Sequence, residues 1–426
     1  MRIRFWRAAG AALGCCVSLA EAQAAESCGT NVTRQNVATC ALANSPALEV
    51  ERQGVAVLAG RERSVSPLLP SNPVLALSGG HRRTDQLRAT NWYATLSQDV
   101  EIAGQRGARR KAAGAARAAQ EQDLVAASRD IARDAWIAYF EALAARDALA
   151  MAQRLERAFE AATTATSAAA ESGVASGVDA DVAEAAALRL TQERIDAERR
   201  SKQALAALAS LLGADPFTSR IRLDGELSPL RNAPSDASPR AQAAVDHRPE
   251  VLSAEATRHS YEHWINVYRR SRVPNLTFSA FAQRDGFDER VLGGGVSLPI
   301  PLPSPLGRTY AGEIDENTAL ARQSASAKER LRRDLKLDVA HAAAAFEAAQ
   351  AQTALFTADR TLRAEQTLSS IAEEIGRGRI AVANVIVAQQ ALIDVLRSSV
   401  ETRLALCVAS VELAHASGLS LTGDGL

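Results

Sequence analysis

Two segments of the chain alternate apolar and polar residues over about ten positions. In residues 91–102 the apolar positions are Trp92, Ala94, Leu96, Val100 and Ile102. In residues 291–302 they are Leu292, Val296, Leu298, Ile300 and Leu302. A period of two over this length predicts β-strands with one apolar face and one polar face. We expect a partner strand before each of them, over residues 73–81 and 274–284, so that each pair forms a hairpin.

Each expected hairpin is followed by a long segment whose apolar and small residues recur at alternating spacings of four and three. This heptad spacing predicts very long helices over residues 107–172 and 309–375. Alanine occupies many of the recurring positions, which lets neighbouring helices approach closely. At about 1.5 Å per residue each helix measures on the order of 100 Å. Turns that contain glycine then reverse the chain, and return helices are expected over residues 180–212 and 382–417.

These landmarks occur twice, at a nearly constant offset of about 200 residues, which indicates a tandem duplication. We expect a first repeat over residues 25–213, a linker or equatorial segment over residues 214–245, and a second repeat over residues 246–418. Residues 419–426 form a C-terminal tail. The linker is rich in Pro, Ser and Asp, which is why it is not assigned to either repeat.

The N-terminal segment has the composition of a secretory signal peptide. Three arginines precede a short apolar stretch, and Ala22-Gln23-Ala24 supplies a cleavage site, so residues 1–24 are expected to be removed. Lipidation at Cys16 is an alternative use of this segment. In an exported chain Cys28 and Cys40 are candidates for a disulfide, whereas Cys407 lies in an apolar helical stretch and is expected to be buried.

Composition and motifs exclude several classes of protein. The chain has 49 basic and 49 acidic residues, and this balance argues against a general nucleic-acid binder. We find no nucleophile motif, no HExxH and no clustered Cys and His, so the sequence predicts neither an enzyme nor a bound cofactor. Glu255, His259 and His263 share one helical face, but such spacing is common on ordinary helix surfaces. We therefore predict no metal site.

Four strands cannot form a closed sheet in lipid, because the open edges would leave backbone groups unpaired in hydrocarbon. If the strands lie in a membrane, the chain must oligomerise, and three copies would supply twelve strands. The expected fold class is therefore mainly α with a small β part. A duplicated unit of β-hairpin and long coiled-coil helices would trimerise into a 12-stranded outer-membrane β-barrel on an α-helical periplasmic tunnel.

With this duplicated arrangement of β-hairpins and long helices, the chain resembles the TolC-like outer membrane factor family. The resemblance rests on the duplication, on the passage from strand to helix over residues 96–109, and on the two helical tips at residues 171–179 and 376–385. It implies a homotrimer in the outer membrane of a Gram-negative bacterium, in contact with outer-membrane lipid and with a large periplasmic part. It also implies two protein partners, a periplasmic adaptor (membrane fusion) protein and an inner-membrane proton-driven efflux pump.

The resemblance also implies roles for residues at the tips. In relatives the tips contact the adaptor, which corresponds here to Gly173, Val174, Gly378 and Arg379. Residues that correspond to the family's gate or latch are Asp179, Arg377, Arg379 and Asn384. The alternative is purely local: the glycines permit the turns, and Asp179 favours the start of a helix. Asn384 and Val387 stand where some relatives carry an aspartate ring, so a carboxylate ring is not expected there.

Within this family, the sequence as a whole is most similar to the outer-membrane components of cobalt–zinc–cadmium and nickel–cobalt resistance systems. The expected function is therefore an exit duct for divalent heavy-metal cations. The same duct serving organic-drug efflux or type I protein secretion is the alternative. A periplasmic coiled-coil scaffold is a different class of protein, but it would not account for the duplicated alternating strands.

Overall fold

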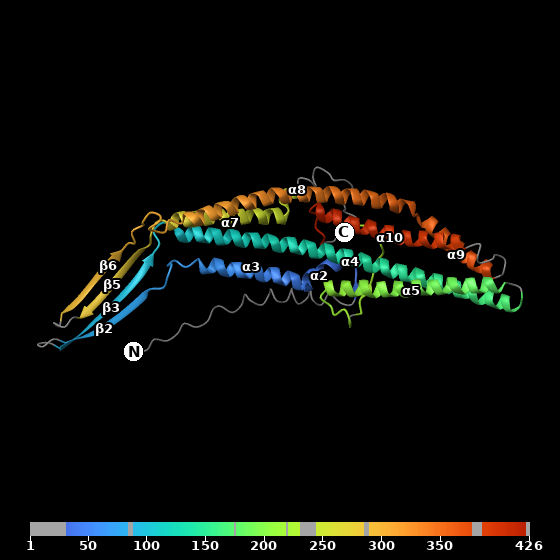
Figure 1. The fold of residues 1–426 in the computed structure, drawn as a ribbon, viewed down its shortest axis with the longest axis horizontal. Helices are drawn as coiled ribbons and strands as arrows, with labels where there is room; N and C mark the ends of the chain where they lie inside the picture. The colour runs from blue at the N-terminus through green and yellow to red at the C-terminus, as the bar shows by residue number, and fades with distance from the viewer. Residues whose placement is uncertain are drawn as a thin grey trace, which may run out of the picture. The chain divides into compact units, whose positions relative to one another are not determined.

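The structure is a computed structural model, and it describes residues 31–83, 88–173, 176–218, 220–230, 244–284, 289–376 and 386–422. Most of these residues are helical and a minority form a small sheet, so the expected fold class, mainly α with a small β part, is confirmed (Figure 1). The chain divides into two compact units. The helical unit comprises Met1–Glu49, Ala127–Val245 and Asp334–Leu426, and the sheet unit comprises Val50–Ala126 and Asp246–Arg333.

The sheet unit is built around four antiparallel strands. They are β2 (Val74–Arg83), β3 (Arg88–Val100), β5 (Leu276–Arg284) and β6 (Arg290–Ser297), in the order β2-β3-β5-β6. The strand expected over residues 291–302 ends at Ser297 instead. Pro299, Pro301 and Pro303 follow it, and proline has no backbone N–H to donate to a neighbouring strand.

Helices meet the sheet at only one of its two ends. α3 (Pro46–Ser64) leads into β2, and α7 (Pro249–Ser271) leads into β5. β3 leads into α4 (Gln105–Glu171), and β6 leads into α8 (Ala311–Leu355). The opposite end of the sheet therefore carries the two hairpin connections, β2–β3 and β5–β6. At the helical end the Gln105 amide donates to the backbone oxygen of Val273 at 3.1 Å, which ties the start of α4 to the segment before β5.

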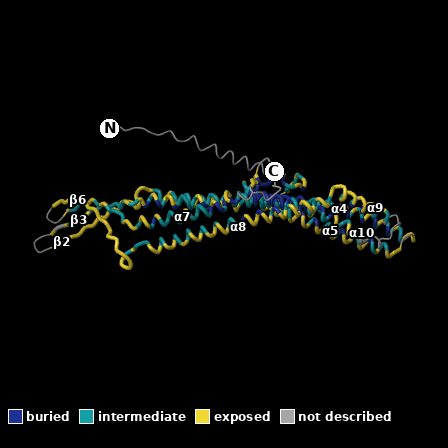
Figure 2. Tube along the Cα trace, turned by 90° about the horizontal axis from the view of Figure 1, so that it is seen from above, coloured by how far each residue is buried: buried dark blue, intermediate teal, exposed yellow. Residues whose placement is uncertain are grey.

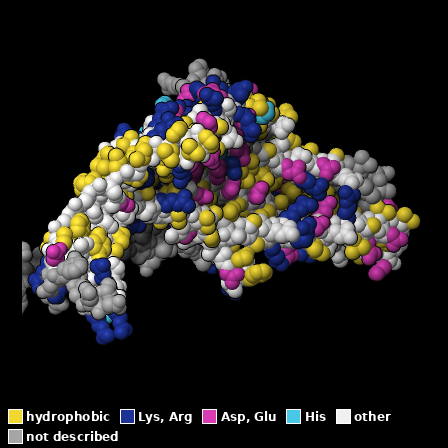
Figure 3. Space-filling model, turned by 60° about the vertical axis from the view of Figure 1, so that its left-hand side comes forward, with side chains coloured by type: hydrophobic (Ala, Val, Ile, Leu, Met, Phe, Trp, Pro, Cys, Tyr) yellow, Lys and Arg dark blue, Asp and Glu magenta, His cyan; other side chains and the backbone are white. Residues whose placement is uncertain are grey.

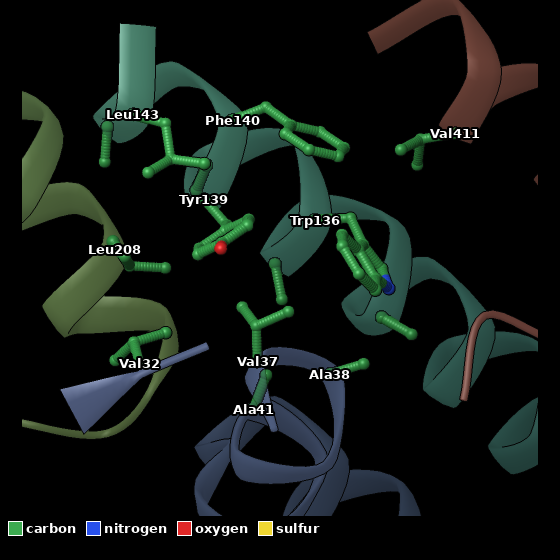
Figure 4. Close-up of a cluster of buried hydrophobic side chains, with 14 of the residues drawn as sticks. Val32, Val37, Ala38, Ala41, Trp136, Tyr139, Phe140, Leu143, Leu208 and Val411 are labelled. Atoms are coloured by element: carbon green, nitrogen blue, oxygen red, sulfur yellow. The ribbon is translucent and has the colours of Figure 1, made fainter. Parts of the chain in front are cut away.

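The helical unit contains a core of large side chains. Its further elements are α2 (Val37–Asn44), α5 (Gly177–Leu211), α9 (Ala358–Gly376), α10 (Ile386–Ala416), and the short parallel pair β1 (Asn31–Val32) and β4 (Arg222–Leu223). The 3-10 turn Val245–His247 begins at the last residue of this segment of the helical unit. Trp136, Tyr139 and Phe140 of α4 pack against α2, α5 and α10 (Figure 4). Buried residues concentrate around this cluster (Figure 2). One turn of α4 thus anchors several separate segments of the chain.

The second long helix is divided. Residues 309–375 were expected to be one helix, but α8 ends at Leu355 and α9 begins at Ala358. Thr357 lies between them, and its Oγ1 accepts from the backbone N–H of Arg360 at 3.4 Å. The Arg360 guanidinium donates to the backbone oxygen of Leu355 at 2.8 Å. A threonine at this position favours the start of a new helix, and the arginine satisfies a carbonyl at the end of the previous one.

The other expected boundaries differ by a few residues, and the short elements β1, α2 and β4 were not expected. α4 and α5 begin two or three residues before the expected starts at 107 and 180, whereas the first residues expected for α10, 382–385, lie outside the described residues. The expected linker over residues 214–245 contains β4, which pairs with β1 near the start of the described chain. The compact units also do not coincide with the two sequence repeats, because each unit draws segments from both repeats.

Candidate functional site

The sheet has one apolar face and one polar face. Its register places Leu75 opposite Leu96, Leu96 opposite Ala280, and Phe278 opposite Val296. Directly opposed residues point to the same side of a sheet, and alternate residues along a strand share a face. One face of the sheet therefore carries Leu75, Leu77, Leu96, Phe278, Leu292 and Val296, and we name it the apolar face. Large side chains on it are exposed, with Leu77 at 72% and Leu292 at 88%.

The opposite face, which we name the polar face, carries mainly hydroxyl, amide and small side chains. Thr95, Ser97 and Asp99 of β3 lie opposite Phe281, Ser279 and Thr277 of β5. Asp99 accepts a hydrogen bond from the Thr277 hydroxyl at 2.5 Å. Tyr93 and Phe281 are the main aromatic contact on this side, with their ring centroids 5.8 Å apart. A sheet with these two faces can separate an apolar phase from water.

The edges of the sheet are β2 and β6, and within the described chain neither has a strand on its outer side. Soluble proteins shorten, twist or cover such edges, because open backbone groups pair readily with other strands. β2 extends over ten residues and carries exposed Val74, Leu75 and Leu77. These edges are suited to pairing with strands of further copies.

The tip between α4 and α5 is the described half of the predicted adaptor and gate region. Gly173 has a φ of 75°, a backbone conformation that glycine adopts without strain. The Ser176 hydroxyl accepts from the backbone N–H of Val178 and so caps α5, whose first turn contains Asp179. Val174 and the second tip, with Arg377, Gly378, Arg379 and Asn384, lie outside the described residues. Gly173 thus follows the end of α4 and Asp179 lies in the first turn of α5, and the described residues do not test a link between the two tips.

Behind this tip, side-chain contacts that sequence reasoning missed join the helices of the helical unit. Arg397 of α10 pairs with Glu193 of α5 at 3.1 Å, and Arg194 of α5 pairs with Glu156 of α4 at 3.1 Å. The hydrogen bond from Arg194 to Glu156 is the main cause of the raised pKa of the Arg194 guanidinium. Arg189 also pairs with Glu193, with Nε and Oε1 3.6 Å apart. These two residues are four positions apart on α5, a spacing that the sequence displays, whereas the two contacts above join separate helices.

Arg189 also contributes to a groove between α5 and α10. With the Gln390 amide turned so that its oxygen faces Arg189, that oxygen accepts from the guanidinium, with Nη2 at 2.8 Å and Nη1 at 2.6 Å. The groove has a volume of about 370 Å³, and its lining combines apolar residues with Asp181, Glu193 and Asp394. Ion pairs between partly exposed groups, such as Arg397 with Glu193, are weak individually.

Of the three weak metal candidates, Glu255 and His259 take part in ordinary ion pairs. Glu255 accepts from Lys328 at 2.7 Å and also pairs with Arg258, and these hydrogen bonds lower its pKa to about 2. His259 lies 3.2 Å from Glu255, whereas burial lowers the pKa of His263. Two cations already occupy the Glu255 carboxylate, so a metal would have to displace them. Among the described residues no group of three or more His, Cys, Asp or Glu could hold a metal ion.

The described cysteines differ in their chemistry. Cys40 is disulfide-bonded, but Cys28 lies outside the described residues, so the pairing of Cys28 with Cys40 stays a prediction. Cys407 is a free and fully buried thiol, and burial raises its pKa to about 12. The expected signal peptide and Cys16 also fall outside the described residues.

Across the described part of the chain, no helix combines the length and the apolar character that crossing a membrane requires.

Comparisons with known proteins agree with the arrangement of sheet and helices. Residues 38–214 match the family model described as outer membrane efflux protein. Protein CyaE of Bordetella pertussis is 28% identical over 306 residues, which are 67% of this chain and 64% of that protein. The match thus spans less than two thirds of the length of that relative.

Solved structures are similar over most of the chain. A crystal structure of CusC has a TM-score of 0.73 at 16% identity, and the match covers 90% of this chain and 92% of that one. The Campylobacter jejuni CmeC outer membrane channel has a TM-score of 0.73 at 15% identity, with 92% and 87% covered. At these identities the similarity concerns the fold. The chain has the fold of these outer-membrane channels, and its residues 38–214 carry the pattern of the outer membrane efflux protein family.

Proposed function

We propose that the chain is the subunit of an outer-membrane efflux channel that works as the exit duct of a tripartite system. One observation carries this proposal: a four-stranded sheet with an exposed apolar face, a polar face and two open edges. Such a sheet is incomplete in lipid, and three copies would close it into a barrel of twelve strands. The apolar face then contacts outer-membrane lipid and the polar face lines the water-filled lumen.

The helical unit supplies the periplasmic part of the proposed duct. A passive duct needs no catalytic group and no bound cofactor, and the energy comes from an inner-membrane proton-driven pump joined through a periplasmic adaptor. We propose that Gly173, Val174, Gly378 and Arg379 contact this adaptor. Asp179, Arg377, Arg379 and Asn384 are the residues that we propose for the gate at the tip. The N-cap at Ser176 and the position of Asp179 in the first turn of α5 are equally consistent with a purely local role.

The cargo that we propose is divalent heavy-metal cations, namely nickel, cobalt, zinc and cadmium. This finer assignment rests on the resemblance to the outer-membrane components of cobalt–zinc–cadmium and nickel–cobalt resistance systems. A duct does not need to bind its cargo tightly, because a site that retains the ion would slow its passage. The ion pairs that occupy Glu255 are consistent with a duct that has no trapping site on α7.

Two measurements test the proposal, one for the channel and one for its cargo. The purified full-length chain in a planar bilayer should conduct ions as a trimer; a monomer without conductance would contradict the duct. The cargo is tested in a deletion strain complemented with this chain and with its native pump operon. Restored resistance to nickel, cobalt, zinc or cadmium, with no change for dyes and detergents, supports the metal cargo. Sensitivity to organic compounds, or loss of a secreted protein, would keep the duct and replace the cargo.

A further inference from the structure

The four connections between helices and strands differ in length. Two of them adjoin the edge strands and are long: residues 65–73 join α3 to β2, and residues 298–310 join β6 to α8. The other two adjoin the central strands β3 and β5, and residues 101–104 and 272–275 form them. We name the first two the edge connections and the other two the inner connections. All four belong to the sheet unit and lie at the end of the sheet where its strands meet helices (Figure 1).

The edge connections are apolar and rich in proline. The one before β2 has no charged residue, and the one after β6 has only Arg308, which pairs with Glu313 at 2.7 Å. Large aliphatic side chains in both are nonetheless exposed, with Leu68 at 76% and Ile300 at 81%. Figure 3 shows hydrophobic side chains gathered at the surface of the sheet unit. Exposed aliphatic residues at this density are typical of a surface that contacts another apolar surface.

The edge connection after β6 stands away from the end of its own sheet. A cavity of about 520 Å³ is lined by residues 299–302 of this connection and by Asp99 and Thr277 of the central strands. The connection folds back on itself, because the Leu306 backbone N–H donates to the backbone oxygen of Pro303 at 2.9 Å. Its aliphatic side chains therefore have a fixed support but are not covered by their own chain.

The edge connection before β2 is held at two points. The Arg106 guanidinium donates to the backbone oxygen of Ser66 at 2.8 Å, and the Gln98 amide donates to that of Ser71 at 3.0 Å. Leu68 lies between these two points and remains exposed. This connection thus also presents an aliphatic side chain outwards from a fixed backbone.

The apolar composition follows the edges of the sheet rather than its end. If position relative to a membrane alone determined it, all four connections would be apolar, because all four lie at the same end. The inner connections instead contain Glu101 and Arg272 within four residues each. A second copy of the chain, in contrast, would adjoin only the edges. We therefore favour a second copy over lipid as the partner of the edge connections.

Strand directions bring the two edge connections together in such an assembly. Each neighbouring pair in the order β2-β3-β5-β6 is antiparallel, so β2 and β6 run in opposite directions. β6 of one copy beside β2 of the next therefore continues the antiparallel order. The connection that follows β6 then lies beside the connection that precedes β2 of the next copy. Proline cannot donate to a strand ladder, so strand pairing between copies has to stop at this level.

We infer that the edge connection after β6 packs against the edge connection before β2 of a second copy of this chain. Ile300 and Leu306 of one copy contact Leu68 and Leu69 of the next, and this apolar contact continues the junction beyond the last paired residues of the strands. The inference rests on the proposed function, since it requires that the open edges of the sheet meet in a trimer. It names the residues that hold neighbouring subunits together where the sheet meets the helices.

Disulfide cross-linking of the full-length protein in outer-membrane preparations tests the contact. Within one chain β2 and β6 are three strand spacings of about 4.8 Å apart, too far for the Cα separation of up to about 7 Å that a disulfide allows. We expect L68C/I300C to give covalent trimers after mild oxidation with copper phenanthroline. The matched control is L68C/V273C, since Val273 is an exposed aliphatic residue of an inner connection and should not cross-link. No covalent trimer in L68C/I300C, or equal cross-linking of both pairs, would overturn the inference.

A charge exchange distinguishes a second copy from lipid as the partner. I300D should lower the yield of heat-modifiable trimer about tenfold, because a carboxylate buried without a partner is costly. L68K/I300D should restore the yield if the two side chains meet, whereas in lipid the second charge would lower it further. I102D, in an inner connection, is the control and should assemble normally. A double variant no better than I300D would contradict the contact.

Conductance of the same preparations separates this inference from the proposed function. A conducting trimer without the cross-link refutes only the contact between the edge connections. The absence of any trimer in the unaltered protein refutes the duct, and the contact with it.

Discussion

Gly173 and Gly177 lie close together in the chain but differ in backbone conformation, and this difference predicts opposite effects of the same substitution. Gly173 has a φ of 75°, whereas Gly177 is the first residue of α5 and has an ordinary helical conformation. An added Cβ meets nothing within 4 Å at either position. Gly173→Ala should therefore destabilise the tip by about 1 kcal/mol, and Gly177→Ala should be neutral or stabilise it by up to about 1 kcal/mol. Amide exchange of residues 168–183 measures both, and equal protection in the two variants would contradict the assignment.

Trp136 is the residue whose truncation should affect the helical unit most. Its side chain is 1% exposed, and its indole Nε1 donates to the backbone oxygen of Leu421 at 3.0 Å. Trp136→Ala should lower the free energy of unfolding by about 3–5 kcal/mol, because it leaves a cavity and an unpaired carbonyl. Leu188→Ala at an exposed position of α5 is the control and should cost well under about 1 kcal/mol. Thermal unfolding followed by circular dichroism compares them; similar midpoints would refute the anchoring role.

The ion pairs of Glu255 predict a pH dependence with a definite sign. Hydrogen bonds from Arg258 and Lys328 lower its pKa from 4.5 to about 2. A carboxyl group with a lowered pKa in the folded state stabilises the protein above its unfolded pKa, and this contribution is lost as the pH falls towards the folded pKa. Glu255→Gln should therefore reduce the melting temperature at pH 7, and the difference should close between about pH 4.5 and pH 2. Glu184→Gln, at an exposed position of α5, is the control and should leave the melting temperature at pH 7 unchanged. A difference that persists at pH 2 would show that the substitution acts through packing.

At the scale of elements, the sequence predicted those features that depend on local periodicity. The alternation in residues 91–102 and 291–302 predicted the apolar face, and the register confirms that Leu96 and Val296 share it with Phe278. The division of the second long helix was missed, because Thr357 supplies a helix cap without a proline or glycine that would mark the break. The early end of β6 was missed although Pro299 was visible, because the apolar pattern continues through Ile300 and Leu302.

Contacts between separate helices could not be predicted from the spacing of residues along a single helix. Glu193 could be placed on α5 from the sequence, but its partner Arg397 is separated from it by 204 residues. The aromatic cluster at Trp136, Tyr139 and Phe140 was missed for a related reason. The heptad pattern of α4 emphasised alanine positions, whereas this turn packs against α2, α5 and α10 from separate parts of the chain.

The pair formed by Glu193 and Arg397 provides the prediction for helix association. Its atoms lie 3.1 Å apart, and both side chains are partly exposed. A double-mutant cycle with Glu193→Gln and Arg397→Gln should give a coupling free energy of about 0.2–1 kcal/mol that decreases with added salt. Exposed Arg199 and Gln203 on α5 serve as the control pair, since they do not join two helices. A coupling well above this range would mean that the pair is a rigid structural link, which would not suit helices that separate at a gate.

At the scale of the whole molecule, the decisive question is what covers the apolar face of the sheet. Leu292 lies on that face and is 88% exposed in the single chain, whereas its neighbour Val291 lies on the polar face. If the apolar face contacts lipid, Leu292→Arg places a charge in hydrocarbon two residues inside the end of β6. The substitution should cost about 1–2 kcal/mol, between the values for the interface and for the bilayer midplane, and lower the yield of inserted trimer. Val291→Arg places the same charge one residue away on the side that faces water, so it should assemble normally.

Both variants keep the strand length and add one positive charge, so the comparison isolates the direction of the side chain. The measurement is the amount of heat-modifiable trimer in the outer-membrane fraction at equal expression. In an aqueous environment neither substitution should change stability by more than about 0.5 kcal/mol, because exposed positions tolerate charge. Equal trimer yields would therefore refute the lipid-facing assignment, and with it the barrel on which the duct depends. A selective loss in Leu292→Arg would link the two-residue period of the sequence directly to insertion in the membrane.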